Sequence, residues 1–229
     1  MITLDVPYRK DSEIELMALE LLKRYEKFAG EAPQPPIPIE NIVEGLLEVS
    51  YTVGDLKGLL GMDDVLGATW LEDKFMMIDG SLDDQPGRFS FTLAHEAGHW
   101  HIHRHYLEME KVTLPLFPRG AGAKPTPAIV CRSGGKKPRQ EFQADMFAAY
   151  LLMPATHVRA AAKTALGEAP LRIEGLEARR KAKEFDPELK DAATAVINAG
   201  GFLNVSNESM RIRLAELKLV VDDAQRELF

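Results

Sequence analysis

Two histidines and a glutamate form the segment His95-Glu96-Ala97-Gly98-His99, which lies in a stretch with the apolar periodicity of a helix. A helix turns by about 100° per residue, so His95 and His99 lie one turn apart on one face, and both imidazoles can reach one metal ion. Glu96 then lies at the edge of that site, where its carboxylate can take a proton from a water molecule at the metal. The spacing predicts a zinc (Zn2+) site with Glu96 as general base.

A motif with only three fixed residues also arises by chance, so its surroundings matter. Phe89, Leu93 and Ala94 form an apolar stripe that leads into His95. Polar side chains that interrupt such a face are costly to bury unless something binds them. The helical context therefore favours a metal site over a coincidental match.

Catalytic zinc usually has three protein ligands, and the sequence offers two candidates for the third. His105 has the spacing of the last metzincin histidine, but Ile102 replaces the glycine at which that pattern turns the chain back toward the metal. Glu141 opens a predicted helix over 140–153, with Asp145 one turn further on the same face. Glu141 could bind the metal while Asp145 holds the second nitrogen of a ligand histidine, or both could form a solvated helix face.

The first motif, followed by Glu141-Phe142-Gln143-Ala144-Asp145 and a helical run that ends at Pro154, resembles the ImmA/IrrE family of metallo-endopeptidases. The resemblance runs from about the first predicted helix to Pro154. It implies that His95, His99 and Glu141 are zinc ligands and that Glu96 is the catalytic base. It also implies a compact, thermolysin-like α+β domain of the minimal gluzincin type. The implied activity is intracellular cleavage of a regulatory protein, such as a helix-turn-helix transcriptional repressor.

An alternative function is that of a non-catalytic regulator, which would keep a degenerate peptidase domain and bind DNA or a partner through its C-terminal tail. The intact Glu96 favours the enzyme, because a purely structural metal site has no use for a base beside it. The group that would stabilise the oxyanion is not fixed by any motif. Tyr106, Tyr150 and His157 are candidates.

The composition is that of a globular protein, with 229 residues, 45% hydrophobic and 28% charged. A net charge of −7 argues against direct nucleic-acid binding by the chain as a whole. The single cysteine, Cys131, fits a reducing compartment, and the start of the chain lacks the apolar core of a signal peptide. No apolar run approaches the length of a membrane span. We expect a cytoplasmic protein that does not insert into membranes.

Helices are expected over 12–29, with a capping box at Ser12 and a stop at Gly30, and over 39–47. Strands are expected at 49–53, 65–71 and 74–79, the last two joined as a hairpin. The motif helix should start at Arg88 and end in a partly exposed turn, where His101 and His103 have no chemical role. In the helix over 140–153 the predicted core stripe comprises Phe142, Met146, Ala149 and Leu152.

Residues 114–140 are rich in Pro and Gly and contain six Lys or Arg but no acidic residue. This basic loop could border the cleft and touch acidic substrate segments, or it could be a solvated linker. A short edge strand is predicted at 128–132. Within it, Cys131 is expected to pack as a small apolar side chain rather than act as a nucleophile or ligand.

We predict a metallopeptidase domain over 1–165 and a helical C-terminal region over 166–229. Helices are expected over 155–166, 173–185 and 187–199, and residues 202–220 resemble the turn and second helix of a helix-turn-helix. There Ser206 would be the N-cap and Met210, Leu214 and Leu217 would be buried. From Ala155 onward there are twelve Lys/Arg and twelve Asp/Glu, so this region is predicted to pack or to dock a partner rather than bind DNA.

Overall fold

The computed structural model describes residues 6–106, 129–132, 138–182 and 184–223, with the backbone alone at 129–132. The fold is mixed α+β, mostly helical with a small sheet. The chain divides into two compact units, Met1–Pro33 with Pro38–Leu151, and Gln34–Ile37 with Leu152–Phe229. The sequence placed the division later, between residues 165 and 166. Among the described residues, no helix has the length and apolar character that a membrane span requires.

The first unit opens with helix α1 (Asp11–Ala29), which ends at Gly30 in a left-handed conformation with φ 82°. Its cap lies earlier than predicted. The Glu13 carboxylate accepts from the backbone N–H of Lys10 at 2.8 Å, so Lys10 rather than Ser12 is the N-cap. The predicted second helix is present as α2 (Ile39–Asn41), which continues as the π-helical segment η1 (Ile42–Leu46).

The sheet contains β1 (Ser50–Gly54), β2 (Val65–Trp70), β3 (Phe75–Asp79) and β4 (Ile129–Arg132) in the order β1-β3-β2-β4. Strands β2 and β3 form the predicted antiparallel hairpin, with β1 parallel to β3 and β4 antiparallel to β2. The edge strand predicted at 128–132 is thus confirmed in the backbone. The short helix α3 (Leu56–Leu60) was not predicted.

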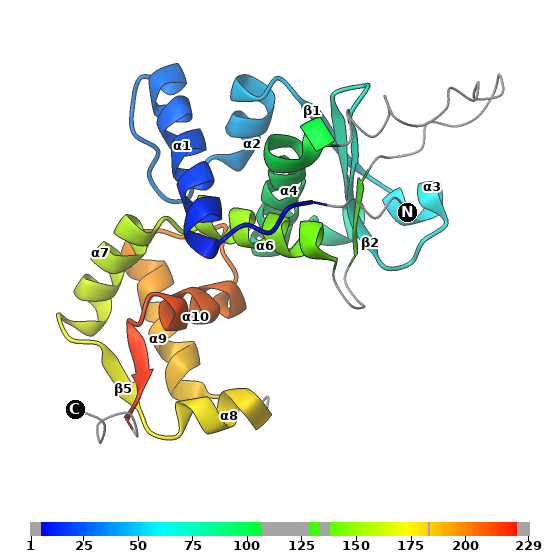
Figure 1. Ribbon diagram of the computed structural model, residues 1–229. Coiled ribbons are helices and arrows are strands. Elements are labelled where there is room, and N and C mark those ends of the chain that lie inside the picture. Colours follow the sequence, from blue (N-terminus) through cyan, green and yellow to red (C-terminus); the bar gives the residue numbers. More distant parts are fainter. Residues whose placement is uncertain (1–5, 107–128, 133–137, 183, 224–229) are drawn as a thin grey trace, which may run out of the picture. The chain divides into compact units, whose positions relative to one another are not determined.

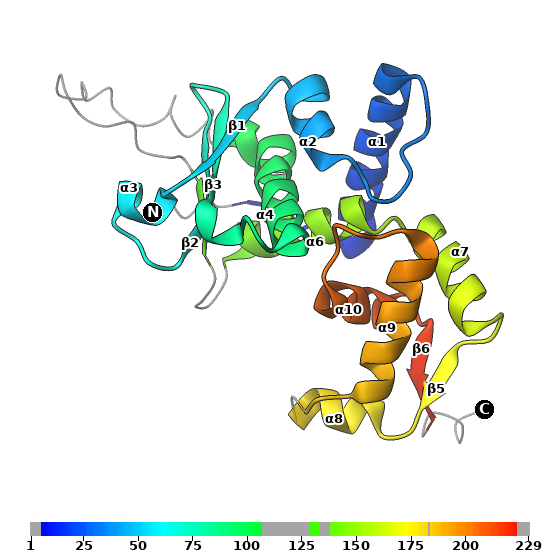
Figure 2. The ribbon, with the colours of Figure 1, turned by 180° about the vertical axis from the view of Figure 1, so that it is seen from behind.

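Helix α4 (Pro86–Gly98) carries the motif and packs on β2 and β3. It follows the single turn η2 (Gly80–Leu82) and begins at Pro86 rather than Arg88, because proline is well suited to the first position of a helix. It continues as the π-helical segment η3 (His99–His103). Figures 1 and 2 show α4 beside the sheet, with α1 and α2 on its other side.

Helix α6 (Arg139–Leu152) is present as predicted, and two members of its predicted core stripe, Met146 and Leu152, are buried, but the other two are not. Phe142 is 56% exposed, and Ala149 is only partly buried. The side chains that α6 buries completely are Ala144, Phe147, Ala148 and Leu151. The helix is rotated in this way because the side of α6 that carries Glu141 faces α4.

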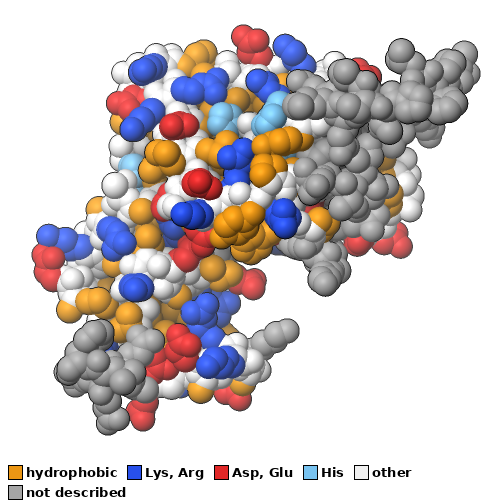
Figure 3. All heavy atoms as spheres, in the orientation of Figure 1, with side chains coloured by type: hydrophobic (Ala, Val, Ile, Leu, Met, Phe, Trp, Pro, Cys, Tyr) orange, Lys and Arg blue, Asp and Glu red, His pale blue; other side chains and the backbone are white. Residues whose placement is uncertain are grey.

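The second unit contains α7 (Ala155–Leu166), α8 (Leu176–Ala182), α9 (Pro187–Gly200) and α10 (Asn207–Glu216). A two-stranded parallel sheet of β5 (Leu171–Ile173) and β6 (Val220–Asp222) was not predicted, and it shortens the helix expected over 173–185. Ser206 is the N-cap of α10 as predicted, and Met210 and Leu214 are buried, whereas Leu217 is only half-buried. Figure 3 shows one face, on which basic, acidic and hydrophobic side chains of the described residues are mixed.

Candidate metal centre

The two motif histidines come from the junction of α4 and η3, and both are buried. His95 lies between Leu93, Ala94 and Ala97, which are fully buried and hold this turn in the core. The Nε2 atoms of His95 and His99 lie 3.0 Å apart. The spacing of one helical turn therefore places the two Nε2 atoms close enough to bind the same metal ion.

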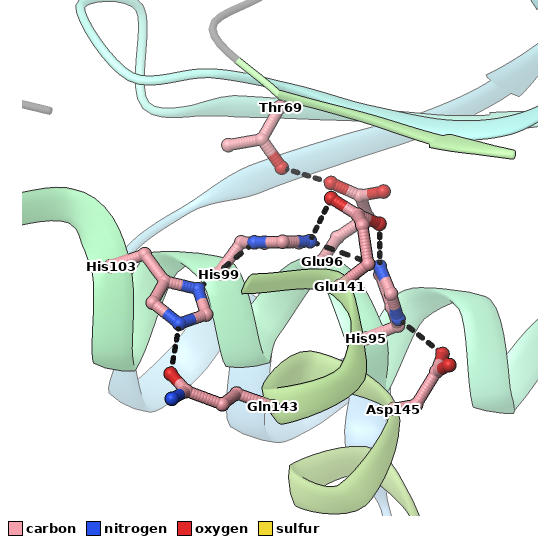
Figure 4. Close-up of polar contacts among 8 residues, drawn as sticks. All are labelled: Thr69, His95, Glu96, His99, His103, Glu141, Gln143 and Asp145. Carbon is pink, nitrogen blue, oxygen red and sulfur yellow. Dashed lines mark hydrogen bonds and ion pairs between the residues drawn. The ribbon is translucent and has the colours of Figure 1, made fainter. Parts of the chain in front are cut away.

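Glu141 from α6 completes the group. Its Oε2 lies 3.2 Å from His95 Nε2 and its Oε1 lies 3.3 Å from His99 Nε2. These ligand atoms all lie within 4.8 Å of one another (Figure 4). The close approach of α6 depends on Gly98, where a Cβ atom would lie 3.1 Å from Phe147 Cδ1 and 3.4 Å from the Ala144 backbone.

The spacing of this group fits a metal ion. Two nitrogen ligands of one tetrahedral zinc ion, each bound at about 2.0–2.1 Å, lie about 3.3 Å apart. The observed separations are 3.0, 3.2 and 3.3 Å. The buried His95, His99 and Glu141 could therefore bind a metal ion.

Asp145 lies where the helical spacing predicts, one turn beyond Glu141. Its Oδ1 is 2.9 Å from His95 Nδ1. A carboxylate can only accept a hydrogen bond, so Nδ1 of His95 carries the proton and Nε2 keeps its lone pair for the metal. The predicted position of Asp145 outside the ligand group is thus observed.

The carboxylate of Glu141 stays ionised in this group. Burial raises its pKa, but the close contacts with the imidazoles of His95 and His99 outweigh burial and hold the pKa well below the ordinary value. Burial lowers the pKa of His99, which favours the neutral imidazole that a metal requires.

Glu96 is fully buried beneath strand β2. Its Oε2 accepts a hydrogen bond from Thr69 Oγ1 at 2.6 Å, as Figure 4 shows. Gly67 makes room for it, because a Cβ atom at this position would lie 2.7 Å from Glu96 Oε1 and 2.8 Å from Thr92 Cγ2. The sequence did not identify Thr69 or Gly67 as neighbours of the site.

The prediction for His103 was wrong. It was expected in an exposed turn with no role, but it is fully buried and its Nδ1 lies 3.0 Å from His99 Nδ1. Its Nε2 lies 3.0 Å from Oε1 of the buried Gln143. Burial lowers the pKa of His103 to about 3. The spacing gave part of the signal, since His103 follows His99 by the same four residues that separate His99 from His95 and so lies on the same helix face.

Among the residues that the structure describes, the ligand group does not include the other candidates. His105 is exposed and contacts the ring of Tyr106, so the metzincin alternative has no support among the described residues. His101 is half-buried against Phe147. Tyr150 is buried. Candidate His157 belongs to α7 of the second unit.

Two predictions fall outside what is described, namely most of the basic loop 114–140 and the packing of the Cys131 side chain. Comparison with known proteins gives no further assignment. No protein-family model matches the chain, and no curated protein matches it either.

Proposed function

We propose that this chain is a zinc-dependent endopeptidase that uses His95, His99 and Glu141 as metal ligands and Glu96 as general base. The observation that carries the proposal is the convergence of three metal-binding groups, with a buried glutamate at the position next to the first ligand. Two imidazoles and one carboxylate are a donor set of catalytic zinc sites, in which a fourth position stays open.

The donor set also argues for catalysis rather than metal storage or structure. Structural zinc sites usually have four protein ligands, often thiolates, whereas three ligands leave room for water or substrate. Zinc bound here would make nearby water more acidic and would polarise a peptide carbonyl. The fold type that the motif pair implies, a thermolysin-like peptidase domain, belongs to the same proposal.

Glu96 would take the proton of the attacking water and return it to the leaving amine. Thr69 donates to one oxygen of this carboxylate, which fixes the orientation of the side chain. Gly67 adds to this constraint, because strand β2 passes directly against Glu96. The base is thus held by the sheet as well as by α4.

The substrate part of the proposal comes from the motif resemblance, which implies a regulatory protein such as a helix-turn-helix repressor. The equal numbers of basic and acidic residues from Ala155 onward support a role for that region in contacts with protein rather than with DNA.

The test is Glu96→Gln, assayed with a repressor encoded beside this chain. We expect the variant to bind zinc as the wild type does and to lose cleavage, because all three ligands remain and the base is gone. The matched control is Glu20→Gln on the exposed side of α1, which should keep both properties. Cleavage at the wild-type rate by Glu96→Gln would place catalysis elsewhere. Zinc binding without any cleavage by the wild type would support the non-catalytic alternative.

A further inference from the structure

A series of hydrogen bonds leads from the second histidine of the motif to the N-terminal segment, and its first two links are buried. His99 Nδ1 lies 3.0 Å from His103 Nδ1, and His103 Nε2 lies 3.0 Å from Gln143 Oε1. Gln143 Nε2 then donates to the carbonyl oxygen of Pro7 at 2.8 Å. This series of hydrogen bonds thus crosses from η3 to α6 and ends on the backbone before α1. Figure 4 shows the links from His99 to Gln143.

The direction of every hydrogen bond in this series follows from its last acceptor, the carbonyl oxygen of Pro7. A carbonyl oxygen can only accept, so the NH2 group of Gln143 faces Pro7 and its oxygen faces His103. His103 must then donate from Nε2. A neutral imidazole protonated at Nε2 has its lone pair at Nδ1, so His99 donates from its own Nδ1. His99 Nε2 keeps a lone pair, which points toward Glu141 and His95.

We propose that His103, Gln143 and the Pro7 carbonyl form a positioning relay that presents the Nε2 lone pair of His99 to the metal. This inference rests on the proposed metal site. Asp145 does the same for His95 through one carboxylate, whereas His99 needs two intermediate side chains. Hydrogen bonds to the outer nitrogen of a ligand histidine fix its tautomer and the orientation of its ring.

The anchor of the relay is itself held in place by α6. Arg139, at the start of α6, donates from Nη1 to the carbonyl oxygen of Val6 at 2.9 Å. Val6 is almost completely buried. Helix α6 therefore supplies the ligand Glu141, the Asp145 carboxylate that contacts His95, the Gln143 side chain of the relay, and the Arg139 contact that holds the residue before Pro7.

A purely structural role for His103 makes different predictions from the relay. A histidine that only fills the core would cost stability when replaced, but zinc affinity measured on folded protein would not change. The relay predicts a loss of affinity that a substitute acceptor restores. Asn is that substitute, because its side-chain oxygen can take the position of the histidine Nδ1 and accept from His99.

The experiment measures zinc affinity by competition with a chelator, on full-length variants whose circular dichroism matches the wild type. We expect His103→Phe to bind zinc about 10–100-fold more weakly, since outer hydrogen bonds to ligand histidines have effects of this size. His103→Asn should recover most of that loss. His101→Phe is the matched control, since His101 lies in the same π-helical segment against Phe147, and it should bind zinc as the wild type does.

A second readout needs neither metal nor activity. Long-range proton–nitrogen NMR spectra of the metal-free chain identify which ring nitrogen of each histidine carries the proton. We expect the proton on Nδ1 of His99 and on Nε2 of His103, and Gln143→Met should remove this preference at His103. Because this measurement is made on the wild type, it tests the relay even if a His103 variant fails to fold.

The results separate the relay from the metal site. Wild-type affinity in a folded His103→Phe variant, or a proton on Nδ1 of His103 in the wild type, would overturn the relay and leave the metal site standing. A wild-type chain that binds no zinc would instead defeat the proposed function, while the NMR spectra would still show whether the hydrogen bonds run in the stated direction.

Discussion

Replacement of Asp145 tests how the first motif histidine is held. Asp145 Oδ1 lies 2.9 Å from His95 Nδ1, and its side chain is 23% exposed. Loss of such an outer hydrogen bond typically weakens metal binding about 10–100-fold, which corresponds to about 1.4–2.7 kcal/mol. Asp145→Leu removes the acceptor and should show the larger loss.

Asp145→Asn keeps an oxygen that can accept from His95 but removes the negative charge. A charge-assisted hydrogen bond is about twice as strong as a neutral one, so we expect about half of the full free-energy loss, about 3–10-fold in zinc affinity. The assay is chelator competition on folded protein. Asp84→Asn, at an exposed position before α4, makes the same charge change and should have no effect. Wild-type affinity in both Asp145 variants would refute the assigned contact.

Three further outcomes follow from the geometry. Gly67→Ala should lower the free energy of unfolding by about 1–3 kcal/mol, as overpacking does, because its Cβ would lie 2.7 Å from Glu96 Oε1; an unchanged urea midpoint would contradict this. His105→Ala should leave zinc affinity at the wild-type level, and a large loss would revive the metzincin arrangement. Because the folded-state pKa of His103 is lowered to about 3, the unfolded chain binds the proton more readily, and the metal-free protein should lose stability as pH falls from the ordinary value of 6.5 toward 3. The slope from this group is at most about 1.4 kcal/mol per pH unit, and equal urea midpoints near pH 7 and near pH 5 would contradict it.

The parts of the site that were predictable from the sequence depend on helix geometry alone. The four-residue spacings of His95 with His99 and of Glu141 with Asp145 place each pair on one face, whatever the rest of the chain does. The hairpin of β2 and β3 was predictable for a similar reason, since its signal is local.

The parts that were missed depend on contacts between distant segments. Spacing alone does not tell whether His103 faces solvent or α6, and only the packing of η3 against Gln143 makes it a neighbour of His99. Hydrophobicity alone placed Phe142 in the core, but the face that presents Glu141 decides the rotation of α6 and leaves Phe142 exposed. Strands β5 and β6 have only three residues each, too few to give a periodic signal.

The most direct test of the metal centre is calorimetric titration of zinc into the metal-free wild type and the Glu141→Ala variant. The account predicts one zinc ion per wild-type chain and a loss of binding by orders of magnitude when the carboxylate is removed, because two imidazoles remain in place of three ligands. Absence of binding to the wild type, or equally tight binding to Glu141→Ala, would contradict the assignment of His95, His99 and Glu141 as the metal ligands.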